Sequence, residues 1–196
     1  HILDSDSILS MFYLPRSLTV LGAGVIASEY ASIFAALGVH VTIVDTGPRP
    51  LAFMDHELSA AFVHAFEREG HRYLPDRGIQ SVEWDGVESV VTTLTSGEVI
   101  HSDKLLCALG RVANVAGLNT EAAGIELTKR GHIKVNEYCE SNVPGVYGVG
   151  DVIGHPALAS TSMEQGRRAM CHALGLPRGQ APELIPIGIY TIPEMS

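Results

Sequence analysis

The first pattern along the chain is an apolar run at residues 18–21, followed by glycines and then by a segment with the 3.6-residue period of a helix. Gly38 can end this helix in a left-handed conformation. Residues 39–44 form a second apolar run, which stops at Asp45. The pattern predicts a strand, a helix and a second strand, and the helix is expected to bury its larger apolar side chains, which are Ile26, Tyr30, Ile33, Phe34 and Leu37.

The next stretch predicts a second helix and then a change of period. Asp55 can cap a helix with a mainly apolar face, which Gly70 ends. Between residues 79 and 100 the period becomes two, with Asp-Gly and Ser-Gly turns, and this predicts an antiparallel meander. The continuous apolar run at residues 105–109 is typical of a strand that returns to a buried parallel sheet.

The C-terminal half is patterned more weakly. Residues 112–143 are rich in turns and predict a passage into a second domain, and residues 146–151 predict a strand that ends at Asp151. Helical spacing follows at residues 160–173, and a strand pattern restarts at 185–192. At the other end of the chain, residues 4–7 can cap a short helix that runs through Met11.

The turn after the first strand has the composition of a phosphate-binding loop. Gly22 permits a sharp turn, Gly24 allows close approach of a ligand, and Ala27 permits close packing of helix and strand. The free N–H groups of the helix start favour a pyrophosphate, and Asp45, 23 residues after Gly22, can hold a ribose diol. We therefore predict a dinucleotide site; the alternative is that the glycines only permit a tight turn.

Composition narrows the functional classes. The chain has 196 residues, a net charge of −9 and a pI near 5.4, which argues against nucleic acid or an anionic membrane as a partner. No apolar run of membrane-spanning length or signal-peptide pattern occurs, so a cytoplasmic location is expected. The three cysteines and nine histidines lack the spacing of a metal site, and no metal is expected. Because the chain begins at His1, we expect that a true N-terminus is missing.

Three motifs occur in the order and spacing of one family. They are Gly-Ala-Gly-Val-Ile-Ala-Ser-Glu at 22–29, Ala-Leu-Gly-Arg at 108–111 and Gly-Val-Tyr-Gly-Val-Gly-Asp at 145–151. Together they resemble the FAD-dependent pyridine nucleotide-disulfide oxidoreductases. Within that family, residues 32–38, 150–154 and 189–194 are most similar to the soluble pyridine nucleotide transhydrogenases.

The resemblance implies a fold and a division of the chain. The implied fold class is α/β, with a Rossmann-like domain of parallel sheet and antiparallel meander followed by part of a second α/β domain, which binds FAD. Residues 1–16 would be an incoming connection, 17–111 the NAD(P)-binding domain, 112–180 the second part of the FAD-binding domain, and 181–196 the truncated start of an interface domain. Family members also carry an N-terminal flavin-binding half, in most cases with a CxxxxC redox pair, and a dimerisation domain; neither is present here, and the full-length protein is expected to be a homodimer.

The resemblance also implies roles for individual residues. Glu29 matches a helix glutamate close to the flavin, although a solvated residue in the first turn of a helix explains it equally well. The implied cofactor-binding residues are, for NAD(P), Gly22, Gly24, Ala27, Asp45, Ile79 and Gly110 with the adjoining Arg111, and, for FAD, Asp151, Ala157, Leu158, Ala159 and Ser160.

The reaction implied is hydride transfer between NAD(H) and NADP(H) through bound FAD. Two alternatives stay open. The first is a lipoamide dehydrogenase or mercuric reductase of the same family, which an intact CxxxxC pair in the missing part would favour. The second is that the chain by itself is a non-catalytic nucleotide-binding fragment.

Overall fold

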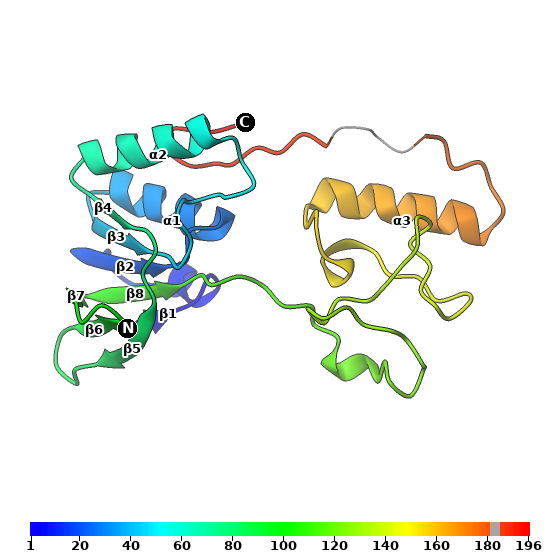
Figure 1. Ribbon diagram of the computed structural model, residues 1–196, viewed down its shortest axis with the longest axis horizontal. Coiled ribbons are helices and arrows are strands. Elements are labelled where there is room, and N and C mark those ends of the chain that lie inside the picture. The colour runs from blue at the N-terminus through cyan, green and yellow to red at the C-terminus, as the bar shows by residue number, and fades with distance from the viewer. Residues whose placement is uncertain (181–184) are drawn as a thin grey trace. The chain divides into compact units, whose positions relative to one another are not determined.

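A computed structural model describes residues 1–180 and 185–196. The chain divides into two compact units (Figure 1). Unit 1 comprises His1–Gly110 and Pro186–Ser196, and unit 2 comprises Arg111–Ile185. No helix within the described part of the chain is both long enough and apolar enough to cross a membrane.

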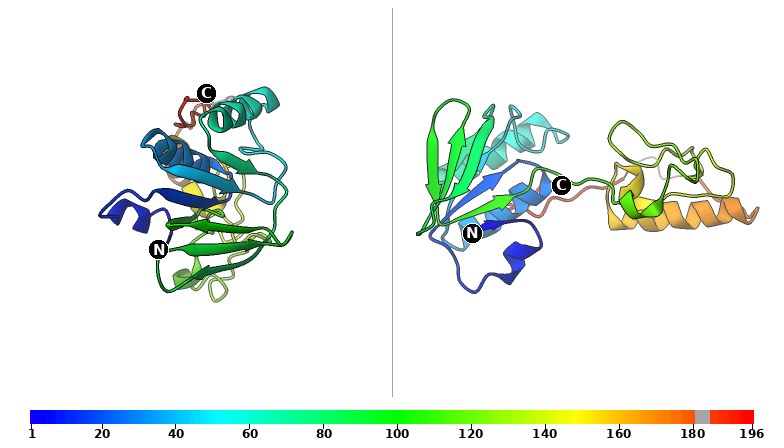
Figure 2. Two further views of the ribbon diagram at one scale, coloured as in Figure 1. Left: turned by 90° about the vertical axis from the view of Figure 1, so that its left-hand side faces the viewer. Right: turned by 90° about the horizontal axis from the view of Figure 1, so that it is seen from below.

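Unit 1 is a three-layer α/β structure. Its parallel sheet has the strand order β1-β8-β2-β3-β4, formed by β1 (Ile2–Leu3), β2 (Ser17–Leu21), β3 (His40–Val44), β4 (Arg72–Leu74) and β8 (Lys104–Cys107). One face is covered by the helices α1 (Val25–Ala36) and α2 (His56–Arg68). The other is covered by an antiparallel sheet of β5 (Ile79–Trp84), β6 (Val90–Leu94) and β7 (Val99–Ser102), as Figure 2 shows. The predicted fold class is confirmed.

The central strands are apolar on both sides because both sheet faces are covered. In β3, Val41 and Ile43 pack toward the helices, whereas Val44 packs toward the antiparallel sheet. All three are completely buried. This double burial explains why the strand has a continuous apolar sequence.

The first helix was predicted correctly in extent but not in its buried face. Ile33 and Leu37 are 40% and 55% exposed, whereas Ala27 and Ala31 are fully buried. Small side chains let α1 lie close to the sheet, so the helix packs through alanines and serines and leaves larger residues at its margin. Of the predicted face only Phe34 is buried.

The second helix follows the prediction. Asp55 caps α2, because its Oδ1 accepts a hydrogen bond of 2.7 Å from Glu57 N. Phe62 and Phe66 are the large side chains that it buries. Gly70 has a φ of +92°, which is the left-handed conformation expected after the helix.

Four further elements differ from the sequence expectation. Strands β1 and β4 were not predicted. The strand predicted at 146–151 is wrong, because the only bridge there joins Tyr147 to Glu140 and residues 150–153 form a 3-10 helix. The strand predicted at 185–192 is also wrong, because Ile189 forms a single bridge to Met195. The predicted interface segment 181–196 falls partly on residues 181–184, which lie outside the described residues.

The described residues of unit 2, 111–180 and 185, have little regular structure. It contains the 3-10 helices η2 (Ala116–Leu118) and η3 (Gly150–Ile153) and the helix α3 (Ala159–Ala173), with isolated bridges at Leu127–Ile133 and Glu140–Tyr147. The helix predicted at 160–173 is thereby confirmed. In unit 1, the short helix predicted near the N-terminus is the 3-10 helix η1 (Ser7–Ser10).

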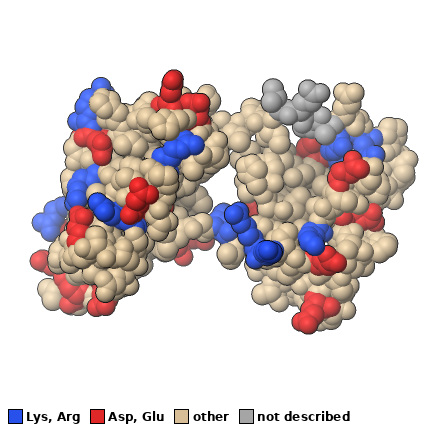
Figure 3. All heavy atoms as spheres, in the orientation of Figure 1, with Lys and Arg blue, Asp and Glu red and all other residues tan. Residues whose placement is uncertain are grey.

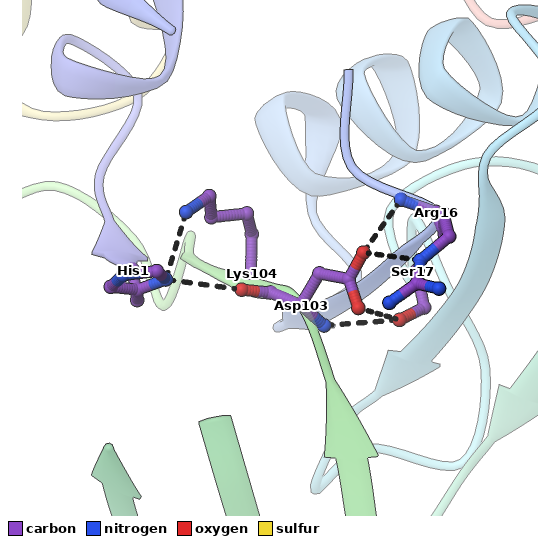
Figure 4. A network of polar contacts seen from close by, with 5 residues as sticks. All are labelled: His1, Arg16, Ser17, Asp103 and Lys104. Atoms are coloured by element: carbon purple, nitrogen blue, oxygen red, sulfur yellow. Dashed lines mark hydrogen bonds and ion pairs between the residues drawn. The ribbon is translucent and has the colours of Figure 1, made fainter. Parts of the chain in front are cut away.

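A polar network ties β2 to β8 at the amino ends of the two strands (Figure 4). Asp103 Oδ2 accepts a hydrogen bond of 2.8 Å from Arg16 N, and Asp103 N donates one of 3.0 Å to Ser17 Oγ. Burial opposes ionisation of Asp103, but the hydrogen bonds and charge of Arg16 outweigh it and lower the pKa of this carboxyl. Elsewhere on the visible face of unit 1, acidic and basic side chains are interspersed (Figure 3).

Candidate functional site

The turn between β2 and α1 is held tightly at its first glycine. Gly22 has a φ of +97°, and its N–H donates a 2.8 Å hydrogen bond to Val44 O. A Cβ at this position would lie 2.5 Å from Ala108 O. Both the backbone angle and the space therefore require glycine, and the turn is fixed against the end of β8.

Gly24 is different, because no atom of the described residues lies close to the space that a side chain would begin to fill. It is the N-cap residue of α1, it is exposed, and a Cβ there would meet no atom within 4 Å. No side chain caps the helix, and Ser28 N makes the helix-type bond to Gly24 O at 2.9 Å. The N–H groups of the first turn are thus left to solvent or to a ligand, beside the positive end of the helix dipole.

Asp45 stands beside this turn, because β2 and β3 are neighbours and both end at the same edge of the sheet. It is half-buried, and its Oδ2 accepts a 3.0 Å hydrogen bond from Gly47 N. Burial, and then the charges of Asp45 and Asp76, raise the pKa of Tyr73. An acid, a helix start and two glycines are therefore gathered at one edge of unit 1.

The remaining predicted nucleotide residues lie in different places. Ile79 begins β5, is half-buried and packs against the core below the parallel sheet. Gly110 is exposed, has a φ of +113° and is the last residue of this part of unit 1. Arg111 begins unit 2.

Glu29 has a partner that the sequence did not indicate. Its Oε1 accepts a 2.9 Å hydrogen bond from Tyr190 N, and one turn further along α1 Ser32 Oγ accepts a 3.1 Å bond from Ile192 N. The C-terminal segment 186–196 is thereby attached to α1 within unit 1. These contacts join residues about 160 positions apart, and no local pattern could have revealed them.

Unit 2 contains a cavity of about 340 Å³ at the carboxyl side of η3. Arg111, Asp151 and Ala157 line it, and Arg111 Nε lies 3.7 Å from Asp151 Oδ2. Both side chains are well exposed, at 73% and 52%, so this ion pair is weak. The carboxylate of Asp151 therefore remains available to a ligand.

The first turn of α3 is, after that of α1, the second α-helix start without a side-chain cap in the described part of the chain. Leu158 is its N-cap residue, without a side-chain hydrogen bond, and Ala159 and Ser160 are exposed in the first turn. The Oγ1 of Thr161 is buried and has no hydrogen-bond partner among the described residues. An unpartnered buried hydroxyl beside free N–H groups is the kind of polar surface that a bound ligand satisfies. The sequence reasoning overlooked Thr161.

Comparison with known proteins places these features in a family. A family model described as pyridine nucleotide-disulphide oxidoreductase matches residues 1–166. The soluble pyridine nucleotide transhydrogenases of Aliivibrio fischeri and Mycobacterium tuberculosis are 43% and 44% identical to the chain over its whole length. The chain spans 42% of the length of each of these relatives.

Solved structures show the same fold. A crystal structure of LpdA from Mycobacterium tuberculosis is similar over 98% of this chain and 42% of its own, with a TM-score of 0.89 and 31% identity. The HOCl-induced flavoprotein disulfide reductase RclA from Escherichia coli is similar over 98% of this chain and 44% of its own, with a TM-score of 0.89 and 25% identity.

Proposed function

Because this chain belongs to the pyridine nucleotide-disulphide oxidoreductase family, we propose that it supplies the nicotinamide-dinucleotide site of an enzyme that transfers hydride between NAD(H) and NADP(H) through FAD. The observation that carries the proposal is the uncapped start of α1 at Gly24 beside Asp45. The relatives of 43–44% identity named as transhydrogenases support it further.

Each residue of the unit 1 site has a separate task in this proposal. The N–H groups after Gly24 bind the pyrophosphate, while Gly22 and Ala27 hold the strand and helix close enough to form the site. Asp45 accepts hydrogen bonds from the adenosine ribose, after its bond to Gly47 N is exchanged or shared. Ile79 contacts the adenine, and Gly110 with Arg111 borders the cofactor.

The residues of unit 2 fit part of a flavin site. Asp151 would hold the ribityl chain, and residues 157–160 would direct helix N–H groups to the pyrimidine end of the ring. The unpartnered Thr161 hydroxyl in the same turn agrees with a ligand there. When bound, FAD supplies a centre that accepts and returns hydride. Glu29 would lie near this ring while its Oε1 holds Tyr190 N.

The division of the chain proposed here follows the same reasoning. Residues 1–16 connect from the FAD domain, 17–111 bind NAD(P), 112–180 complete the FAD domain and 181–196 begin an interface domain through which full-length copies pair in the cytoplasm. Reduction of a disulfide is a second candidate, because RclA is named a disulfide reductase. Its lower identity, 25% against 43% for the Aliivibrio transhydrogenase, makes that candidate the weaker one.

Two measurements test the proposal. The full-length protein should transfer hydride from NADPH to an NAD analogue whose reduced form absorbs at a shifted wavelength, and it should not reduce a disulfide substrate comparably. The 196-residue chain should bind NADH, and Asp45→Ala should weaken that binding about tenfold or more through loss of a charged hydrogen bond. Unchanged NADH affinity in Asp45→Ala would show that the ribose lies elsewhere.

A further inference from the structure

Arg49 is the cation nearest in sequence to Asp45, and its guanidinium makes three hydrogen bonds elsewhere. Its Nη1 donates to Met54 O at 2.9 Å and to Ser59 Oγ at 3.2 Å, and its Nη2 donates to Ala52 O at 2.6 Å. Among the described residues it forms no ion pair with Asp45. The guanidinium is therefore directed to the start of α2.

The loop restricts how Arg49 could reach the ribose site. Pro48 and Pro50 flank it and fix their own φ angles, so the backbone around Arg49 is stiff. A move of the guanidinium toward Asp45 must then come from the side chain. Arg49 and Ser59 both line an adjoining cavity of about 460 Å³, so the side chain is not enclosed by protein on that side.

Ser59 is the one member of this arrangement whose contact is made by a side chain. It is 1% exposed and belongs to α2, so its hydroxyl is fixed in position. Ala52 and Met54 contribute backbone carbonyls, which substitution does not remove. Ser59 is consequently the one of these three acceptors that a substitution can remove.

We propose that Ser59 is a positioning residue for cofactor choice, which helps to hold the Arg49 guanidinium away from Asp45 and thereby weakens NADP(H) binding relative to NAD(H) at a site that accepts both. The inference rests on the proposed function, because it assumes that Asp45 binds the ribose. With Arg49 held, a 2′-phosphate would meet the Asp45 carboxylate without a compensating cation. With Arg49 released, its planar guanidinium can pair with the phosphate in a bidentate manner.

The test measures dissociation constants of NADH and NADPH by nucleotide fluorescence on the full 196-residue chain. In Ser59→Ala, we expect the NADPH-to-NADH ratio of dissociation constants to fall about two- to tenfold, the range that one hydrogen bond controls. This fall in the ratio should disappear in the double variant Ser59→Ala with Arg49→Gln. Arg49→Gln alone should leave the ratio within about twofold of wild type, since the held side chain does not reach the cofactor.

Ser32→Ala is the matched control, because Ser32 is also a buried helical serine and its hydroxyl contacts the C-terminal segment. It should not change the ratio. Thermal unfolding verifies the fold of each variant, and Ser59→Cys, a weaker acceptor of similar size, replaces Ser59→Ala if that variant does not fold.

If wild type binds NADH, two results overturn the inference. One is an unchanged ratio in Ser59→Ala, and the other is a lowered ratio that persists in the double variant. Failure of wild type to bind NADH overturns the proposed function and the inference with it.

Discussion

The two units of this chain differ in how much of their apolar surface they bury. Both hydrophobic clusters belong to unit 1, in which the thirteen residues of α2 bury Phe62 and Phe66. In unit 2 the fifteen residues of α3 bury only Ala169, and Met163 and Met170 are 72% and 57% exposed. A helix with this pattern needs a further surface to cover it. Unit 1 therefore carries a complete core and the turn proposed to bind the pyrophosphate, whereas unit 2 carries a partial core and the residues proposed to form part of a flavin site.

The largest expected difference concerns the two cofactors. We expect the purified chain to bind NADH but to be colourless and inactive in hydride exchange. Asp151 and one helix end provide a few hydrogen bonds, of roughly 0.5–3 kcal/mol each, against several kcal/mol lost on immobilising FAD. An absorption spectrum near the flavin bands is the measurement, with the full-length protein as the yellow control. A purified chain that is yellow and carries one flavin per chain would contradict this difference between the units.

Amide hydrogens of unit 2 should exchange about a thousandfold or more faster than those of the central strands of unit 1. Amides of β2, β3 and β8 exchange through global unfolding of unit 1, whereas those of residues 111–180 exchange through local opening, because few of their side chains are buried. Mass spectrometry of peptic fragments gives both rates in one experiment. Equal protection would show that unit 2 has a hidden source of stability.

Within unit 1, the two glycines of the turn should separate binding from folding. Gly24→Val should reduce NADH affinity about a hundredfold or more, with an unchanged melting temperature, because a Cβ there meets no atom within 4 Å and the branched side chain would enter the space proposed for the pyrophosphate. Calorimetric titration and thermal unfolding measure the two effects. Retained affinity in a folded Gly24→Val variant would refute the phosphate assignment.

Gly22→Ala should instead act on folding. The positive φ and the 2.5 Å approach to Ala108 O should lower the free energy of unfolding by about 3 kcal/mol. Urea unfolding measures this loss. A stable Gly22→Ala variant with intact NADH binding would show that the turn can relax, and the rigid end of β8 would not be needed to shape the site.

The smallest effect concerns Asp103, which fixes the amino ends of β2 and β8 (Figure 4). Asp103→Asn should cost roughly 1 kcal/mol of unfolding free energy at pH 7, and Ser102→Ala in the neighbouring strand end serves as a comparison. Because the folded-state pKa of Asp103 lies below the ordinary value of 3.8, its contribution is complete above that pH and declines as the pH falls through the folded-state value. Wild type and Asp103→Asn should therefore converge in strongly acidic urea titrations; a constant difference would contradict the assigned charge state.

The sequence predicted the elements that have a strong local pattern. β2, β3 and β8 were predictable because they are buried on both faces, and α2 because Asp55 and Gly70 mark its ends. Strands β1 and β4 have two and three residues and are too short to display a period. The apparent strand at 146–151 contains Gly148 and Gly150, and glycine weakens a strand; residues 150–153 form a 3-10 helix instead.

The candidate site was predictable to the same extent. Gly22, Gly24 and Asp45 belong to one βαβ pattern, and that pattern alone implies that they lie close together. The bond from Tyr190 N to Glu29 and the bond from Arg49 to Ser59 could not be predicted, because they depend on how helices approach segments that are distant or irregular. Local periodicity contains no information on such contacts.

The strand order of unit 1 also determines how long β2 lacks one of its neighbours during synthesis. β2 lies between β3 and β8, yet 82 residues separate Leu21 from Lys104. At roughly 5–20 residues per second, a ribosome needs about 4–16 s after β2 to begin the synthesis of β8. In that interval the edge of β2 is unpaired and open to other chains, so the nascent protein is most prone to aggregate, and most in need of a chaperone, before residue 104 leaves the exit tunnel.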